Sequence, residues 1–286
     1  MADEAGMADL RREEVDAIVK NYTMEKLTML QVCAVIKTSS ATNTYYQETD
    51  SVITKMTTSA ITDTTFGGLT GGSGFPHIEH SWTEVNEKVR KHGADNVLAW
   101  DVVNLSAINV RARMLERVAE AVAHSVDTAC ITELATTTNT AAATATWDNA
   151  TESLQQPLKD ILKGQAAMTI HNWDAYTNIY LILHPTNFME LMNNPICRNA
   201  GQFYTDGVTR KGRVGKIANC TILVNNASTE NTVLMCIGQK ALAWYEASPL
   251  KTVVIEDPGQ TYKIRAWQVG VPVLINNYAA YKITGC

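Results

Sequence analysis

The sequence lacks the local motifs by which many enzymes are recognised. The glycine-rich run at 67–74 is followed by Phe75 and Pro76, whereas a phosphate-binding loop ends in Gly-Lys-Ser/Thr. Its spacing does not give the dinucleotide fingerprint either. Ser73 has no glycine two residues later, which the nucleophile elbow of a hydrolase requires. We therefore predict no catalytic residue, no cofactor-binding residue and no enzymatic activity.

A clear metal-binding pattern is also lacking. In the segment His77-Ile78-Glu79-His80, a strand would place His77 and Glu79 on one face and His80 on the other, so three converging ligands are not offered. His92 is expected in a charged turn. The remaining histidines are isolated in sequence: His124, His171 and His184. We predict no metal site.

Closely spaced cysteines are absent as well. The six cysteines are spread over the chain, at positions 33, 130, 197, 220, 236 and 286. Zinc knuckles and redox motifs need short spacings, so neither is indicated. Cys33 and Cys236 lie in the apolar runs "MLQVCAVI" and "VLMCIG", where thiols behave as small hydrophobic groups. We predict buried, free thiols and a reducing compartment.

The chain has no strong charge of one sign and no long apolar run. It carries 24 basic and 29 acidic side chains, a net charge of −5, which does not favour a dedicated nucleic-acid reader but allows enclosure of nucleic acid. The most basic patch, 209–216, could touch a phosphate backbone, although a solvated loop is the simpler interpretation. No run approaches the ~20 apolar residues of a membrane span, and the acidic start lacks a signal peptide. A soluble protein made in the cytoplasm is expected.

Residues 45–92 have the pattern of a long β-hairpin. The stretch 45–66 is rich in threonine and β-branched residues, 67–74 is nearly all turn formers, and 75–91 returns with alternating residue types. Both faces are polar, and a two-stranded hairpin is marginal by itself in water. A neighbouring subunit is the natural support for it.

A change of period then predicts one long helix. Residues 95–103 read as a short strand, and 107–134 as a helix capped at its start by Asn104 or Ser106. Its apolar residues recur every three or four positions: Leu115, Val118, Ala119, Val122, Val126 and Ala129. At 1.5 Å per residue it would span roughly 40 Å, more than a compact core usually needs.

The second half alternates helix and strand signals after a Thr- and Ala-rich linker at 135–151. One helical face is predicted from four residues, and Gly164 is expected to break that helix: Leu154, Leu158, Ile161 and Leu162. Thr186 is expected to cap a second helix at 187–194. Buried strands are predicted at 178–185, 220–226, 231–238 and 240–247.

The final segment, 251–284, reads as antiparallel strands. Turns are predicted at 257–259 and around Gly270 and Pro272. The residue pattern of the central region fits an α/β or an α+β domain, and the fold class predicted for the whole chain, with the family resemblance below, is α+β.

This order of elements resembles one family. The hairpin at 45–92 and the helix at 107–134 carry the resemblance, together with three segments: "NIYLILHPTNFMELMNN", "GRVGKIANCTILVNNAS" and "YKIRAWQVGVPVLINNYAAYKIT". Over residues 40–286 the chain is similar to the major capsid proteins of tailed bacteriophages and related archaeal viruses. These proteins have the HK-ninety-seven-like fold, which they share with encapsulins.

The resemblance implies a division of the chain into four regions. They are an N-terminal arm at 1–43, an extended hairpin loop at 44–94, a peripheral domain at 95–146 and 251–286 with the long helix as its spine, and an axial domain at 147–250. It also implies that the protein assembles with itself through pentamers and hexamers into an icosahedral shell. The shell would enclose double-stranded DNA through nonspecific contact, with assembly in the host cytoplasm and residence in the virion. A scaffolding, portal or decoration protein is a possible partner, and no membrane is involved.

Two departures from the family stand out. The arm is short, so the long scaffolding segment of some members is expected to be absent. Lys55 lies in the hairpin, but no partner asparagine or acidic catalyst can be matched to it, so a covalent crosslink is not predicted.

Three alternatives stay open. An encapsulin has the same fold and packages enzyme cargo. A hydrolase or transferase would use the central domain, with an acid–base cluster around His171 or His184. A tail or tube protein would form helical stacks.

Overall fold

The computed structural model describes residue 19 and residues 28–48, 82–105, 110–171, 173–199, 216–257 and 259–286. The predicted hairpin tip, His77–His80, Lys55 and most of the predicted arm and basic patch lie outside the described residues. The chain divides into two compact units, each assembled from three stretches of sequence. Unit 1 comprises 1–43, 87–133 and 243–273, and unit 2 comprises 44–86, 134–242 and 274–286.

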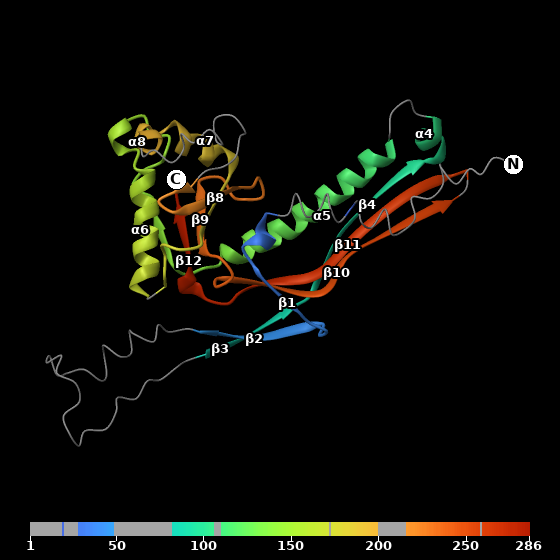
Figure 1. Ribbon diagram of the computed structural model, residues 1–286, viewed down its shortest axis with the longest axis horizontal. Helices are drawn as coiled ribbons and strands as arrows, with labels where there is room; N and C mark the ends of the chain where they lie inside the picture. The colour runs from blue at the N-terminus through green and yellow to red at the C-terminus, as the bar shows by residue number, and fades with distance from the viewer. Residues whose placement is uncertain are drawn as a thin grey trace, which may run out of the picture. The chain divides into compact units, whose positions relative to one another are not determined.

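Unit 1 contains a four-stranded sheet and the long helix α5 (Figure 1). The strand order is β1-β10-β11-β4. The elements are η1 (Met29–Gln31), β1 (Ala34–Lys37), β4 (Arg90–Ala99), α4 (Trp100–Leu105), α5 (Val110–Leu134), β10 (Leu242–Asp257) and β11 (Thr261–Leu274). β1 pairs with β10 in parallel, and β4 pairs with β11 antiparallel from Thr261↔Ala99 to Gly270↔Arg90.

The core of unit 1 forms between α5 and this sheet. Leu115, Val118 and Val122 of α5 are buried in one cluster with Ile264 and Ala266 of β11. The 3.6-residue period of the sequence therefore predicted the buried face of α5 correctly.

Three local predictions in unit 1 were wrong. The strand expected at 95–103 ends at Ala99, and the chain turns into α4, where the Trp100 amide donates to the Gln260 carbonyl (3.0 Å). His92 does not lie in a charged turn but in β4, 9% exposed. No turn forms around Gly270 and Pro272, since β11 continues through both to Leu274.

Unit 2 is built on a six-stranded mixed sheet with the order β5-β12-β9-β6-β8-β7. Its strands are β5 (Thr140–Ala142), β6 (Ile179–Leu183), β7 (Lys216–Ile217), β8 (Cys220–Val224), β9 (Thr232–Ile237) and β12 (Ala280–Thr284). The pairs β5–β12 and β6–β8 are parallel, and β12–β9, β9–β6 and β7–β8 are antiparallel. The predicted strands at 178–185, 220–226 and 231–238 correspond to β6, β8 and β9.

Helix α6 (Pro157–Ile170) packs on this sheet and is not broken at Gly164. A Cβ at that position would lie 2.6 Å from Met235 Sδ and 2.8 Å from Tyr281 Cδ1, so glycine allows the helix to approach β9 and β12 closely. Leu154 and Leu162 do not belong to the buried face, since they are 45% and 48% exposed.

Two short helices follow β6, namely α7 (Pro185–Asn193) and α8 (Pro195–Asn199). His184, and not Thr186, caps α7: its ring nitrogen Nδ1 accepts from the Thr186 amide (3.3 Å), and Pro185 occupies the first helical position.

The two units divide the chain differently from the predicted domains. Residues 134–146 and 274–286 fall in unit 2 because β5 and β12 belong to the six-stranded sheet, and 243–250 fall in unit 1 because they are part of β10. The stretch 135–151 is also not a loose linker, since Trp147 within it is 1% exposed.

The described ends of the predicted hairpin do pair. β2 (Thr42–Glu48) and β3 (Trp82–Lys88) form a separate two-stranded sheet (Figure 1). Within the part of the chain that the structure describes, no helix is long and apolar enough to cross a membrane.

Candidate assembly surfaces

The four histidines that the structure describes, His92, His124, His171 and His184, do not converge on a reactive centre. His92 Nδ1 hydrogen-bonds Ser125 Oγ (2.9 Å), and burial, followed by the charge of Arg90, lowers the pKa of His92. His171 stacks on Tyr278 with ring centroids 3.9 Å apart, and burial lowers its pKa. These contacts, like the helix cap made by His184, position backbone and rings rather than a substrate.

Among the described residues, no group of three or more His, Cys, Asp or Glu side chains is arranged to hold a metal ion. All six cysteines are free and buried, as predicted from the apolar runs around Cys33 and Cys236.

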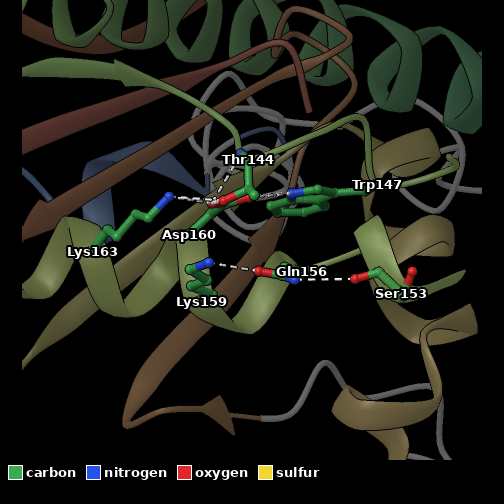
Figure 2. Close-up of polar contacts among 7 residues, drawn as sticks. All are labelled: Thr144, Trp147, Ser153, Gln156, Lys159, Asp160 and Lys163. Atoms are coloured by element: carbon green, nitrogen blue, oxygen red, sulfur yellow. Dashed lines mark hydrogen bonds and ion pairs between the residues drawn. The ribbon is translucent and has the colours of Figure 1, made fainter. Parts of the chain in front are cut away.

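The most developed polar feature of unit 2 lies at the start of α6 (Figure 2). Asp160 is 2% exposed, and its Oδ1 accepts from the Thr144 amide (3.1 Å) and the Thr144 hydroxyl (2.6 Å). Its Oδ2 accepts from Trp147 Nε1 (3.4 Å), and Lys163 Nζ lies 3.4 Å from Oδ1. The carboxylate therefore fixes the 144–147 segment against α6.

A second chain of contacts runs along the exposed side of the same helix. Lys159 Nζ donates to Gln156 Oε1 (2.9 Å), and Gln156 Nε2 donates to the Ser153 carbonyl (3.1 Å) (Figure 2). Together these bonds connect the first turn of α6 with the segment that precedes it.

A pocket of about 530 Å³ is lined by α6, by the segment before it and by the start of α8. Most of the lining surface is apolar, and five apolar residues contribute to it: Pro157, Leu158, Leu162, Ala166 and Ile196. Lys159 and Lys163 are among the five polar residues that also line the pocket. Leu162 and Ile196 are 48% and 55% exposed. Exposed apolar surface of this kind on a folded unit marks a site of contact with another molecule.

The base of the hairpin offers a second exposed surface. Tyr46 of β2 is 60% exposed and Trp82 of β3 is 57% exposed, on a sheet of only two strands. Gln47 Nε2 donates to the Leu274 carbonyl (3.1 Å), which ties β2 to the segment that leads into β12. Large aromatic side chains on such a sheet are typical of interface residues.

In unit 1, exposed apolar side chains gather where β4 passes into α4. Val97, Trp100 and Val102 are 45%, 41% and 48% exposed. Sequence reasoning missed both this surface and the pocket on α6, because it placed Leu162 in the core and 100–103 in a strand. A signal for the exposed position of Leu162 was present in the sequence: Leu162 precedes Gly164 by two residues, which puts the two on roughly opposite sides of the helix.

Comparison with known proteins assigns the chain to a family. Residues 82–283 match the phage capsid protein family. No curated protein matches the chain significantly.

Solved structures with the same fold are distant in sequence. A virus-like particle from Pyrococcus furiosus has a TM-score of 0.65 at 11% identity, covering 95% of this chain and 98% of that one. The capsid of cyanophage P-SCSP1u has a TM-score of 0.63 at 14% identity, covering 90% and 88%. The mature capsid of bacteriophage PhiM1 has a TM-score of 0.60 at 14% identity, covering 90% and 86%.

The predicted HK-ninety-seven-like α+β fold and the predicted capsid role are thereby confirmed. The protein is a structural component of a virion shell and not an enzyme. This chain belongs to the phage capsid protein family.

Proposed function

We propose that many copies of this chain assemble through pentamers and hexamers into an icosahedral shell that encloses double-stranded DNA. The observation that carries the proposal is the apolar pocket on α6 of a capsid-family protein, with Leu162 and Ile196 about half exposed. Apolar surface left open on one subunit is stabilised when a neighbour covers it, and closed symmetric assemblies cover every copy of such a surface.

Unit 2 is assigned as the axial domain and unit 1, with α5 as its spine, as the peripheral domain. Under this assignment the pocket on α6 contacts the next axial domain around a symmetry axis. The exposed apolar residues at the β4–α4 junction contact a neighbour at the periphery. Contacts within a pentamer and a hexamer differ slightly, and the hairpin and the arm absorb that difference.

The hairpin supports the proposal because its two-stranded sheet has little stability of its own. A two-stranded sheet with Tyr46 and Trp82 more than half exposed gains stability when it lies on another surface. A neighbouring subunit supplies that surface in a shell, and such contacts distribute the assembly energy over many weak interactions.

DNA contact is proposed to be nonspecific. With a net charge of −5, the chain has no strong overall electrostatic attraction to phosphate, so its contact with DNA is weak. The shell holds DNA by enclosing it and does not read its bases. Assembly is proposed to take place in the host cytoplasm.

The experiment is to express the chain alone and with its neighbouring structural genes and to image the product by cryo-electron microscopy. Closed particles with five-fold and six-fold clusters are expected. A product that stays a small oligomer under both conditions, or that forms helical tubes, would contradict the proposal.

The cargo separates a virus shell from an encapsulin. Particles purified from the natural source should contain nuclease-protected double-stranded DNA. Particles filled with an enzyme and free of DNA would instead establish the compartment.

A further inference from the structure

Residues 28–33 are held against α5 by one buried carboxylate. Thr28 donates to Asp127 Oδ2 through its amide (3.2 Å) and its hydroxyl (2.7 Å), and the Met29 amide donates to Oδ1 (3.1 Å). Asp127 is 2% exposed. The start of η1 is therefore fixed beside one turn of the helix.

Two cysteines follow these anchors at matching steps. The Cys33 amide donates to the Met29 carbonyl (3.2 Å), which places Cys33 one turn after Met29. Cys130 lies three residues after Asp127 on α5, and positions three apart are neighbours on a helix surface. Both cysteines are buried, with 3% and 0% exposure. The Cys33 side chain is the first cause of the raised pKa of Cys130, as expected for neighbouring thiols.

Other thiols in the chain have different surroundings. The Cys220 thiol donates to the Ala218 carbonyl (3.7 Å) and the Cys286 thiol to the Ile283 carbonyl (3.9 Å). Cys220 Sγ also accepts from Gln165 Nε2 of α6 (3.3 Å), so the recorded partners of these thiols are backbone or amide groups. Cys33 and Cys130 instead have another thiol as neighbour, from a segment about a hundred positions away.

We propose that Cys33 and Cys130 form a disulfide when the folded protein meets a low-molecular-weight disulfide. The Cys33 thiolate attacks one sulfur of that reagent and releases its first thiolate. The Cys130 thiolate then attacks Cys33 Sγ of the mixed disulfide and releases the second. Two protein thiols are oxidised, the reagent is reduced to two thiols, and the two protons end on those products.

The surroundings of the pair make the reaction slow until the segment opens. The neighbouring Cys33 side chain and burial raise the pKa of the Cys130 thiol, so little thiolate exists in the closed state. Reaction requires residues 28–33 to leave α5 briefly. Once the disulfide has formed, it holds these residues against α5. In the shell proposed above, the disulfide forms after the particle is released from the reducing cytoplasm. That timing rests on the proposed function, whereas the ability to form the disulfide does not.

The test uses the isolated wild-type chain and needs no assembly. The reduced protein is incubated with oxidised glutathione, remaining thiols are alkylated, and a tryptic digest is analysed by mass spectrometry without reduction. Trypsin leaves Cys33 in peptide 27–37 and Cys130 in peptide 118–159, each with a single cysteine. We expect these two peptides to be linked, and Tm to rise by about 10 °C, reversibly with a thiol reductant.

Two variants separate this bond from general oxidation. Cys33→Ser removes both the linked peptides and the rise in Tm, and Cys197→Ser retains both. A stable glutathione adduct at either cysteine without linkage, or alkylation of both after prolonged incubation, would overturn the proposal. So would linkage of either cysteine to a third one. Particle formation is scored separately, so failure of the shell and failure of the disulfide remain distinguishable.

Discussion

The buried carboxylate of Asp160 offers a direct test of how unit 2 is held together. Replacing Asp160 by alanine removes the acceptor of the Thr144 amide, the Thr144 hydroxyl and Trp147 Nε1. Thr144 is exposed, so its hydroxyl can turn to water, but Trp147 is 1% exposed and its N–H has no access to solvent.

The magnitude follows from the donors left unpaired. A buried donor without an acceptor costs about 1–3 kcal/mol. With the Trp147 indole and the Thr144 amide both affected, Asp160→Ala should lower the free energy of unfolding by about 2–6 kcal/mol. Lys163 is 47% exposed, so its ion pair with Asp160 should contribute at most about 1 kcal/mol.

Urea unfolding of the unassembled protein, followed by near-ultraviolet circular dichroism, measures this difference. Lys163→Met is the matched control, because it removes the ion pair and the exposed bond from Lys163 to the Thr144 hydroxyl (2.8 Å), and leaves the three hydrogen bonds to Asp160 intact. Asp160→Asn keeps one acceptor oxygen and should fall between the two. If Asp160→Ala were no more destabilising than Lys163→Met, the hydrogen bonds to Asp160 would contribute nothing measurable to the free energy of unfolding, and the reasoning would be refuted.

Three further substitutions test other parts of the structure. Gly164→Ala usually stabilises a helix, but here the new methyl group meets Met235 and Tyr281, so thermal unfolding should show a loss of about 1–3 kcal/mol; an increase in Tm would contradict the close approach. Burial and a neighbouring arginine lower the pKa of His92, so the unfolded chain takes up a proton near pH 6.5 before the folded one does. Wild-type stability should therefore fall below pH 6.5 by up to about 1.4 kcal/mol per pH unit more than that of His92→Asn, measured by urea titrations between pH 5 and 8; parallel curves would refute a buried neutral imidazole. Leu162→Ser should leave monomer stability within about 0.5 kcal/mol but reduce particle yield in light scattering, whereas Leu162→Met should assemble normally; equal yields would remove the pocket from the interface.

The sequence predicts those elements whose fold-forming signal is local. The apolar period of α5 and the continuous apolar runs of β6, β8 and β9 are properties of neighbouring residues, and each appears in the structure. The burial of Cys33 and Cys236 follows in the same way from the apolar runs around them.

The predictions that were wrong depended on contacts between distant residues. Gly270 signals a turn by itself, but a Cβ there would lie 2.4 Å from the Trp244 indole, so glycine is needed for close packing within a continuous strand. Pro272 lies past the last β11 residue in register with β4, so its missing N–H costs no hydrogen bond to that strand. Leu162 was wrongly predicted to lie in the core for a related reason. The sheet packs on the side of α6 that carries Gly164, but the periodicity treats Gly164 as the end of the helix and so does not indicate that side.

The strand order of unit 2 has a consequence for synthesis on the ribosome. β12, at residues 280–284, lies between β5 and β9, and it is the strand with which β5 is paired. A nascent chain that stops before residue 280 leaves β5 without this partner and one edge of β9 open. Prematurely terminated chains therefore expose unpaired strand edges, which are prone to associate with other chains. Completion of the six-stranded sheet thus waits until residues 280–284 have been made.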